Sequence, residues 1–82
     1  MRVKSFIGDG NYYEIDSQGD IGWFNRNRVF HRLDGPAVVY KNGIVIYYID
    51  GESLDRKNWE EDPRVKKALL KKKIENILDK IS

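Results

Sequence analysis

Residues 37–49, AVVYKNGIVIYYI, are the stretch that decides the fold. Two runs of apolar and aromatic residues flank Asn42-Gly43, a pair that tolerates positive φ at both central positions of a tight turn. Such a turn matches the right-handed twist of paired strands. The stretch therefore predicts an antiparallel hairpin closed by a two-residue loop.

A weaker copy of this hairpin lies 24 residues earlier in the chain, where Ile15 aligns with Val39 and Trp23 with Tyr47. Self-similarity at a fixed period is typical of repeat architectures. We expect the first copy to turn at Gln18-Gly19, between strands at 11–16 and 20–25. Short flanking strands are expected at 3–7 and 29–31, with breaks at 8–10 and 34–36. Residues 3–51 thus predict an antiparallel meander of five to six short strands.

The apolar period changes after residue 51. Ser53 or Asp55 can cap a short helix over 53–61, because both side chains accept from unpaired backbone N–H groups. Asp62 before Pro63 predicts the start of a second helix, since a proline at the first helical position loses no hydrogen bond. From Val65 onward, apolar residues recur at steps of three and four and predict an amphipathic helix over 63–81, about 28 Å long. The predicted fold class is α+β, a hairpin-repeat sheet packed by this helix.

Length and composition limit the protein to a single small domain over 1–82. The chain has 82 residues, 40% of them hydrophobic, so we expect a thin core and a radius of gyration of roughly 12 Å. It has no cysteine and one histidine, which excludes disulfides, thiolate metal sites and histidine clusters. No apolar run approaches the ~18 residues of a membrane span, and the N-terminus does not resemble a signal peptide. We expect a soluble, cytoplasmic protein with no cofactor and no membrane partner.

His31 is the side chain from which any acid-base proposal must start, because its ordinary pKa lies near neutrality. No hydroxyl nucleophile with a recognisable signature accompanies it. We interpret His31 as a structural residue whose ring bonds the turn at 34–36. The acidic residues at 60–62 suit the positive end of the following helix, although they could also form a cation site or a carboxylate pair. The sequence predicts no catalytic residues, no metal site and no enzyme activity.

Alternation along the predicted hairpin gives the sheet two apolar faces. The two-residue loop would place Val39, Ile46 and Tyr48 on one face. One helix covers one face, so the other would leave an apolar patch of several hundred Å², more than a monomer normally exposes. The alternative is that the short helix around Trp59 or the N-terminal strand covers this patch. The predicted protein-binding residues, all placed on the second face, are Trp23, Tyr40, Val45 and Tyr47.

Charge is divided along the chain. The net charge is +2, but residues 1–62 carry −3 and residues 63–82 carry +5. Clustered lysines can bind nucleic-acid phosphates, although such a face is often only solvated. The spacing of Leu70, Ile74, Ile77 and Ile81 fits a coiled-coil seam as well as a core-facing stripe. The candidate nucleic-acid contacts are Lys66, Lys67, Lys71, Lys72, Lys73 and Lys80.

The segments HRLDGPAV at 31–38, YKNG at 40–43 and YYIDG at 47–51 resemble the "HRxDGPAV…NG…WYxxG" repeats of small proteins from tailed phages and large DNA viruses. Those repeats are similar to MORN-type hairpin repeats. The likeness covers residues 11–55, and 51–63 resembles the short helical segment that follows such repeats. This chain departs from the pattern by having Asp55-Arg56 where His31-Arg32 stand in the first unit. The resemblance implies stacked β-hairpins and a viral origin.

Two functional hypotheses follow from the sequence. In the first, the protein is a non-enzymatic phage-type inhibitor that binds a host component through the aromatic sheet face, in the manner of an anti-defence factor or a toxin inhibitor. In the second, it is an RNA-binding accessory protein that uses the lysine-rich helix, with RNA able to bridge protein partners. Because an exposed apolar face can pair with itself, we also expect a homo-oligomer, with a homodimer favoured.

Overall fold

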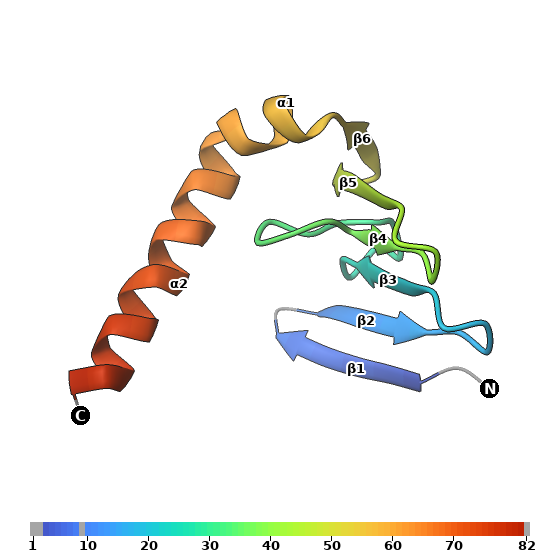
Figure 1. The fold of residues 1–82 in the computed structure, drawn as a ribbon, viewed down its shortest axis with the longest axis horizontal. Coiled ribbons are helices and arrows are strands. Elements are labelled where there is room, and N and C mark those ends of the chain that lie inside the picture. Colours follow the sequence, from blue (N-terminus) through green and yellow to red (C-terminus); the bar gives the residue numbers. More distant parts are fainter. Residues whose placement is uncertain (1–2, 9, 82) are drawn as a thin grey trace.

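The computed structural model describes residues 3–8 and 10–81 and shows a six-stranded antiparallel sheet followed by two helices (Figure 1). The strands lie side by side in chain order, which confirms the predicted α+β meander. The break predicted at 8–10 includes Asp9, which lies outside the described residues. The elements are β1 (Val3–Gly8), β2 (Asn11–Ile15), β3 (Ile21–Phe24), β4 (Val38–Val39), β5 (Val45–Ile49), β6 (Glu52–Leu54), α1 (Arg56–Glu61) and α2 (Pro63–Ile81).

The 24-residue repeat is present in the strand register. Ile15 pairs with Ile21 between β2 and β3, and Val39 pairs with Val45 between β4 and β5, so both partners are displaced by the same step. The loops repeat as well. The Gly19 N–H donates to the Asp16 carbonyl at 3.1 Å, and the Gly43 N–H donates to the Tyr40 carbonyl at 2.9 Å. The two copies therefore form the same hairpin.

The loop of the second hairpin has three residues, 41–43, and the predicted two-residue turn is wrong. The Tyr40 N–H donates to the Ile44 carbonyl at 2.8 Å and closes the loop. Gly43 has a φ of 94°, whereas Asn42 is not among the described residues with positive φ. A turn followed by one left-handed glycine is the common three-residue hairpin loop. Asn42 contributes through its side chain, whose Oδ1 accepts from the Ile44 N–H at 3.1 Å.

The longer loop shifts the register by one residue and exchanges the faces of β4. Val38 pairs with Ile46 and Val39 with Val45, so the prediction that Val39 and Ile46 share a face is wrong. In a sheet, a shift of one residue moves every side chain of a strand to the opposite face. The predicted aromatic surface is consequently divided, with Tyr40 on one side of the sheet and Val45 on the other.

One side of the sheet carries a continuous run of stacked and tilted aromatic rings, and we call it the ladder face. The run crosses three strands and the connection after β3, with centroid separations between 4.9 and 6.0 Å, and ends on β5. Gly22 lies beneath it, where a Cβ atom would meet carbons of the Phe24 and Phe30 rings at 3.1 Å. The rings of the ladder are those of Phe6, Tyr12, Phe24, Phe30 and Tyr48.

The connection between β3 and β4 runs between β3 and β5, where the His31 N–H donates to the Trp23 carbonyl at 2.9 Å and the Arg32 N–H donates to the Tyr48 carbonyl at 3.1 Å. Buried Asn25 organises it, because its Oδ1 accepts from the Asn27 N–H at 2.8 Å and its Nδ2 donates to Asp50 at 3.1 Å. Phe30 is thereby placed beside Phe24. The strand predicted at 29–31 is reduced to a single bridge between these two phenylalanines. Backbone hydrogen bonds to both neighbouring strands and the side-chain hydrogen bonds of Asn25 together hold this connection.

The hydrophobic core lies at the β5–β6 end of the sheet, beneath α1. It is formed by Ile49, Trp59 and Val65, each less than 5% exposed. The Trp59 Nε1 also donates to the Arg32 carbonyl at 3.1 Å, which ties α1 to the loop before β4. Asp55 caps α1 as predicted, accepting from the Asn58 N–H at 2.7 Å. The expected helical start at residue 53 is wrong, because 52–54 pair with β5 as β6.

α2 has the predicted bounds but does not pack across the sheet. Asp62 caps it as expected, with Oδ1 accepting from the Arg64 N–H at 2.8 Å. Val65 is fully buried, and the helix then leaves the body of the molecule (Figure 1). Of the described helices and strands, only α1 packs closely against the backbone of α2. The radius of gyration is 13.6 Å, larger than the value expected from chain length, because α2 projects.

The apolar residues of α2 form two stripes rather than the single one predicted. Leu70 follows Val65 by five positions, which corresponds to about 140° around a helix. Val65 faces the core, while Leu70 is 58% exposed. No helix in the described part of the chain has the length and hydropathy needed to cross a bilayer.

Candidate functional site

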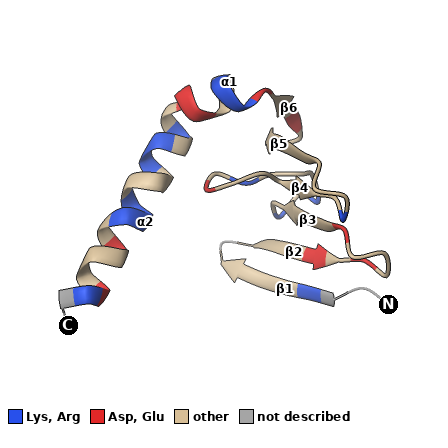
Figure 2. Ribbon diagram, viewed as in Figure 1, with Lys and Arg blue, Asp and Glu red and all other residues tan. Residues whose placement is uncertain are grey.

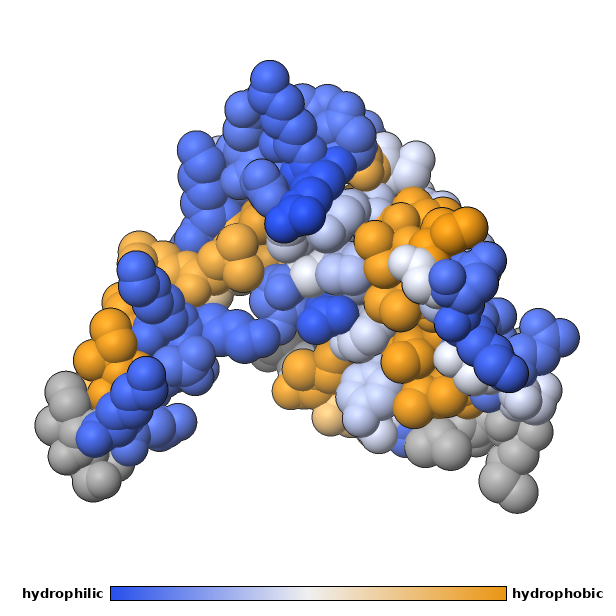
Figure 3. All heavy atoms as spheres, in the orientation of Figure 1, coloured by the Kyte–Doolittle hydropathy of each residue, from blue (hydrophilic) through white to orange (hydrophobic). Residues whose placement is uncertain are grey.

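A cleft of ≈ 640 Å³ separates α2 from the side of the sheet opposite the ladder face, and we call that side the cleft face. Its sheet wall includes Tyr13 and Trp23, whose ring centroids lie 5.8 Å apart. The space-filling view shows this hollow between the projecting helix and the sheet (Figure 3). Its lining residues are Ile7, Asn11, Tyr13, Trp23, His31, Arg32, Leu33, Asp34, Ala68, Lys71, Lys72 and Glu75.

Arg32 closes the floor of the cleft over Trp23. The guanidinium carbon lies 3.9 Å from the centroid of the indole ring, a cation–π contact. The Arg32 Nε donates to Asp34 at 2.8 Å, and Nη1 donates to the Pro36 carbonyl at 3.1 Å. Asp34 in turn pairs with the Lys72 ammonium of α2 at 3.5 Å. This chain of contacts links the cleft face to the projecting helix.

The Asp34 carboxyl has a lowered pKa. Partial burial raises it, but the hydrogen bond and charge of Arg32, together with Lys72, outweigh burial. A depressed pKa in the folded state stabilises the fold above the ordinary carboxyl pKa of about 4, and this contribution is lost as the pH falls through the folded-state value. We therefore expect Asp34→Asn to reduce the loss of stability between pH 7 and pH 3. Urea midpoints of both proteins at the two pH values measure this, and equal acid sensitivity would contradict it.

His31 bonds a different turn from the one predicted. Its Nδ1 accepts from the Asp50 N–H at 3.0 Å, next to the Asp50 carboxylate at 3.2 Å. Asp50 has a φ of 50°, a conformation that non-glycine residues rarely adopt. The role expected of His31 at residues 34–36 is taken by Arg32. His31 thus holds the turn between β5 and β6.

The four predicted protein-binding residues do not form one surface. Tyr47 packs against Trp59 at 4.6 Å, so α1 covers it, as the alternative interpretation anticipated. Trp23 lies beneath Arg32. Tyr40 and Val45 are 40% and 41% exposed, on opposite sides of the sheet. The register shift and these two covering contacts break up the expected aromatic patch.

The six predicted lysines are distributed along α2 (Figure 2) and are all exposed. Their spacing places them on several sides of the helix rather than on one. Lys71 and Lys72 line the cleft, together with Asp34 and Glu75. Lys66, Lys73 and Lys80 follow one another at steps of seven residues, about two helical turns, and lie on another side of the helix. Lys67 follows Lys66 in the first turns. The cationic surface is therefore distributed, and acidic groups share its cleft side.

A surface that the sequence analysis left open as a coiled-coil seam, but did not include among the binding residues, lies along α2 on the side turned away from the sheet (Figure 3). We call it the outward stripe. Its members are between 48% and 59% exposed. The signal was available in the five-residue step from Val65 to Leu70, which places the two residues on different sides of a helix. The outward stripe consists of Leu70, Ile74 and Ile77, with Leu78 at its border toward the cleft because it follows Lys71 by seven positions; the side chain of Ile81, part of the predicted seam, lies outside the described residues.

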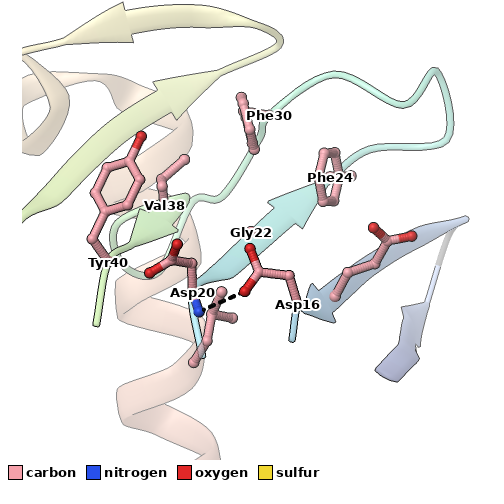
Figure 4. Close-up of a pocket in the computed structure, with 9 residues that line it drawn as sticks. Asp16, Asp20, Gly22, Phe24, Phe30, Val38 and Tyr40 are labelled. Carbon is pink, nitrogen blue, oxygen red and sulfur yellow. Dashed lines mark hydrogen bonds between the residues drawn. The ribbon is translucent and has the colours of Figure 1, made fainter. Parts of the chain in front are cut away.

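A smaller hollow of ≈ 220 Å³ lies on the ladder face beside Tyr40 (Figure 4). Two of its carboxylates, those of Asp16 and Asp20, accept hydrogen bonds from backbone N–H groups of the hairpin loops. Asp16 Oδ1 accepts from the Gln18 and Asp20 N–H groups at 2.9 and 3.0 Å. Asp20 Oδ1 accepts from the Lys41 N–H at 2.8 Å and so joins the two loops of the repeat. Within the described chain, no group of three or more histidine or carboxylate side chains is placed to hold a metal ion.

Comparison of the chain with protein-family models, with curated proteins and with solved structures found no match.

Proposed function

We propose that this protein is a non-enzymatic protein-binding module and that its contact surface is the outward stripe of α2. The observation that carries the proposal is the direction of the stripe. Leu70, Ile74 and Ile77, each about half exposed, point away from the fold on a helix whose cleft side is polar, and Leu78 extends this apolar surface at its border. This surface replaces the aromatic sheet face as the proposed binding surface.

The size of the stripe supports a partner. Four half-exposed leucine and isoleucine side chains give a contiguous apolar surface on the order of 300–400 Å², comparable to the largest patch of a typical monomer, which is often functional. Burial of such surface contributes about 25 cal/mol per Å².

Within this function, the proposal that the protein acts in a host cytoplasm as an inhibitor of a host component rests on the resemblance of the repeat to viral proteins.

RNA binding is the second candidate, and one observation favours it. The cleft brings Tyr13 and Trp23 opposite Lys71 and Lys72, and aromatic rings beside cations are the usual platform for single-stranded nucleic acid. Lys72 is paired with Asp34, and Glu75 also lines the cleft. These carboxylates repel phosphate, so the outward stripe is the stronger candidate surface.

A capture experiment separates the two candidates. The immobilised protein is exposed to bacterial lysate beside two variants that add the same charge, Ile74→Glu in the outward stripe and Asn76→Glu outside it. We expect Ile74→Glu to lose at least tenfold of the specifically captured protein and Asn76→Glu to retain it, with no effect of nuclease treatment. Loss of capture upon nuclease treatment, or by Lys72→Glu while Ile74→Glu still captures, would favour RNA. Equal capture by Ile74→Glu and the parent protein would contradict the proposed function.

A further inference from the structure

We propose that the outward stripe binds an acidic amphipathic helix and forms a two-helix coiled coil with it. This inference rests on the proposed function and specifies the chemistry of the partner. It is carried by two features of α2, the spacing of the exposed aliphatic side chains and the sign of the charges that flank them. Each feature selects a different property of the partner.

The spacing selects a helix. Leu70, Ile74 and Ile77 follow one another at steps of four and three residues, the spacing of the core positions of a coiled coil. The side chains are 58%, 48% and 48% exposed, so they can act as knobs for the holes of a facing helix. The helix that presents them is already formed and is fixed at its start by buried Val65. A partner helix therefore meets a preorganised seam, which lowers the entropic cost of binding.

The flanks select negative charge. If Leu70 and Ile77 occupy the same heptad position, Lys66 and Lys73 fall on one border of the seam and Lys71 on the other. Residues at these borders set partner choice through ion pairs. Glu75 lines the cleft on the far side of the helix and does not neutralise the borders. A partner with glutamates at the corresponding positions would face lysines on both sides of the seam.

A second copy of this chain fits less well. In a parallel pair, Lys66 of one copy would lie against Lys71 of the other, and Lys73 against Leu78. In an antiparallel pair, the lysines at 66, 73 and 80 would face one another. Like charges across a seam are unfavourable. An anionic membrane would suit the lysines, but α2 contains no aromatic residue of the kind that anchors interfacial helices.

The test uses a synthetic four-heptad peptide with isoleucine and leucine at its core positions and glutamate at both flanking positions. A matched peptide carries lysine at the flanking positions. Calorimetric titration into the whole protein is expected to show one-to-one binding of the glutamate peptide. The lysine peptide should bind at least tenfold more weakly. Ile74→Glu should weaken binding of the glutamate peptide at least tenfold, and Asn76→Glu, which adds the same charge outside the seam, should change it less than threefold.

Two further measurements use the same proteins. The first is a flotation assay with vesicles of equal parts phosphatidylcholine and phosphatidylglycerol. The second is sedimentation of the protein alone. Equal affinity for the two peptides, or no binding of the glutamate peptide, overturns the inference. Stripe-dependent flotation or self-association without peptide binding also overturns it, in favour of a lipid surface or a second copy. If the glutamate peptide fails but lysate capture still depends on Ile74, the proposed function stands and only the acidic helix is excluded.

Discussion

Trp59→Ala is expected to lower the free energy of unfolding by about 3–5 kcal/mol, the usual cost of truncating a buried tryptophan. The indole ring is 4% exposed and belongs to the small core with Ile49 and Val65. A core of this size rarely supplies more than about 3–5 kcal/mol in total. The variant should therefore be largely unfolded at 25 °C.

The loss has three separate causes. Removal of the ring takes away the packing of Tyr47, whose ring centroid lies 4.6 Å from that of Trp59. It leaves the Arg32 carbonyl without the Nε1 donor at 3.1 Å. It also removes the contact that holds α1, and through α1 the start of α2, against the sheet. Urea denaturation followed by circular dichroism measures the change.

Two control variants make this prediction specific. Trp59→Phe keeps most of the apolar packing and loses the hydrogen bond, so we expect an intermediate loss of about 1–3 kcal/mol. Leu78→Ala removes a side chain that is 59% exposed and should change stability by less than about 0.5 kcal/mol. A Trp59→Ala protein as stable as Leu78→Ala would show that the core does not lie where we place it.

Much of the fold could be predicted because its local signals are strong. The aspartate caps at residues 55 and 62 and the proline at residue 63 define where the helices begin. The 24-residue repeat predicts the hairpins β2–β3 and β4–β5, and the registers of these two hairpins match one another as the repeat requires. These are interactions between residues close in sequence, and short-range chemistry decides them.

The loop length at 41–43 could not be chosen from the residue pair alone. Asn-Gly is compatible with a two-residue turn and with a three-residue loop that ends in a left-handed glycine. The difference of one residue exchanges the faces of β4 and separates Tyr40 from Val45. A small uncertainty in the turn thus became a large error in the predicted binding surface.

The contacts of the cleft depend on residues that are distant in sequence. Trp59 reaches Arg32, and Lys72 reaches Asp34, across 27 and 38 residues. Nothing in the local pattern of Arg32 predicts that its guanidinium lies over Trp23 rather than in solvent. The direction of α2 also could not be predicted from local sequence, because the departure of the helix from the sheet depends on how Val65 packs into the core. By contrast, the division of its apolar residues into two stripes follows from helical geometry.

The central claim is that Ile74 faces solvent while Val65 faces the core, and thiol labelling tests it most directly. The chain has no cysteine, so Ile74→Cys, Asn76→Cys and Val65→Cys each carry a single reporter. At low protein concentration and neutral pH, a maleimide reagent should modify the cysteines at positions 74 and 76 at similar rates. It should modify the cysteine at position 65 at least a hundredfold more slowly, since that side chain is fully buried. Protection at position 74 with free reaction at position 76 would mean that α2 packs its aliphatic stripe against the sheet, and the proposed binding surface would not exist.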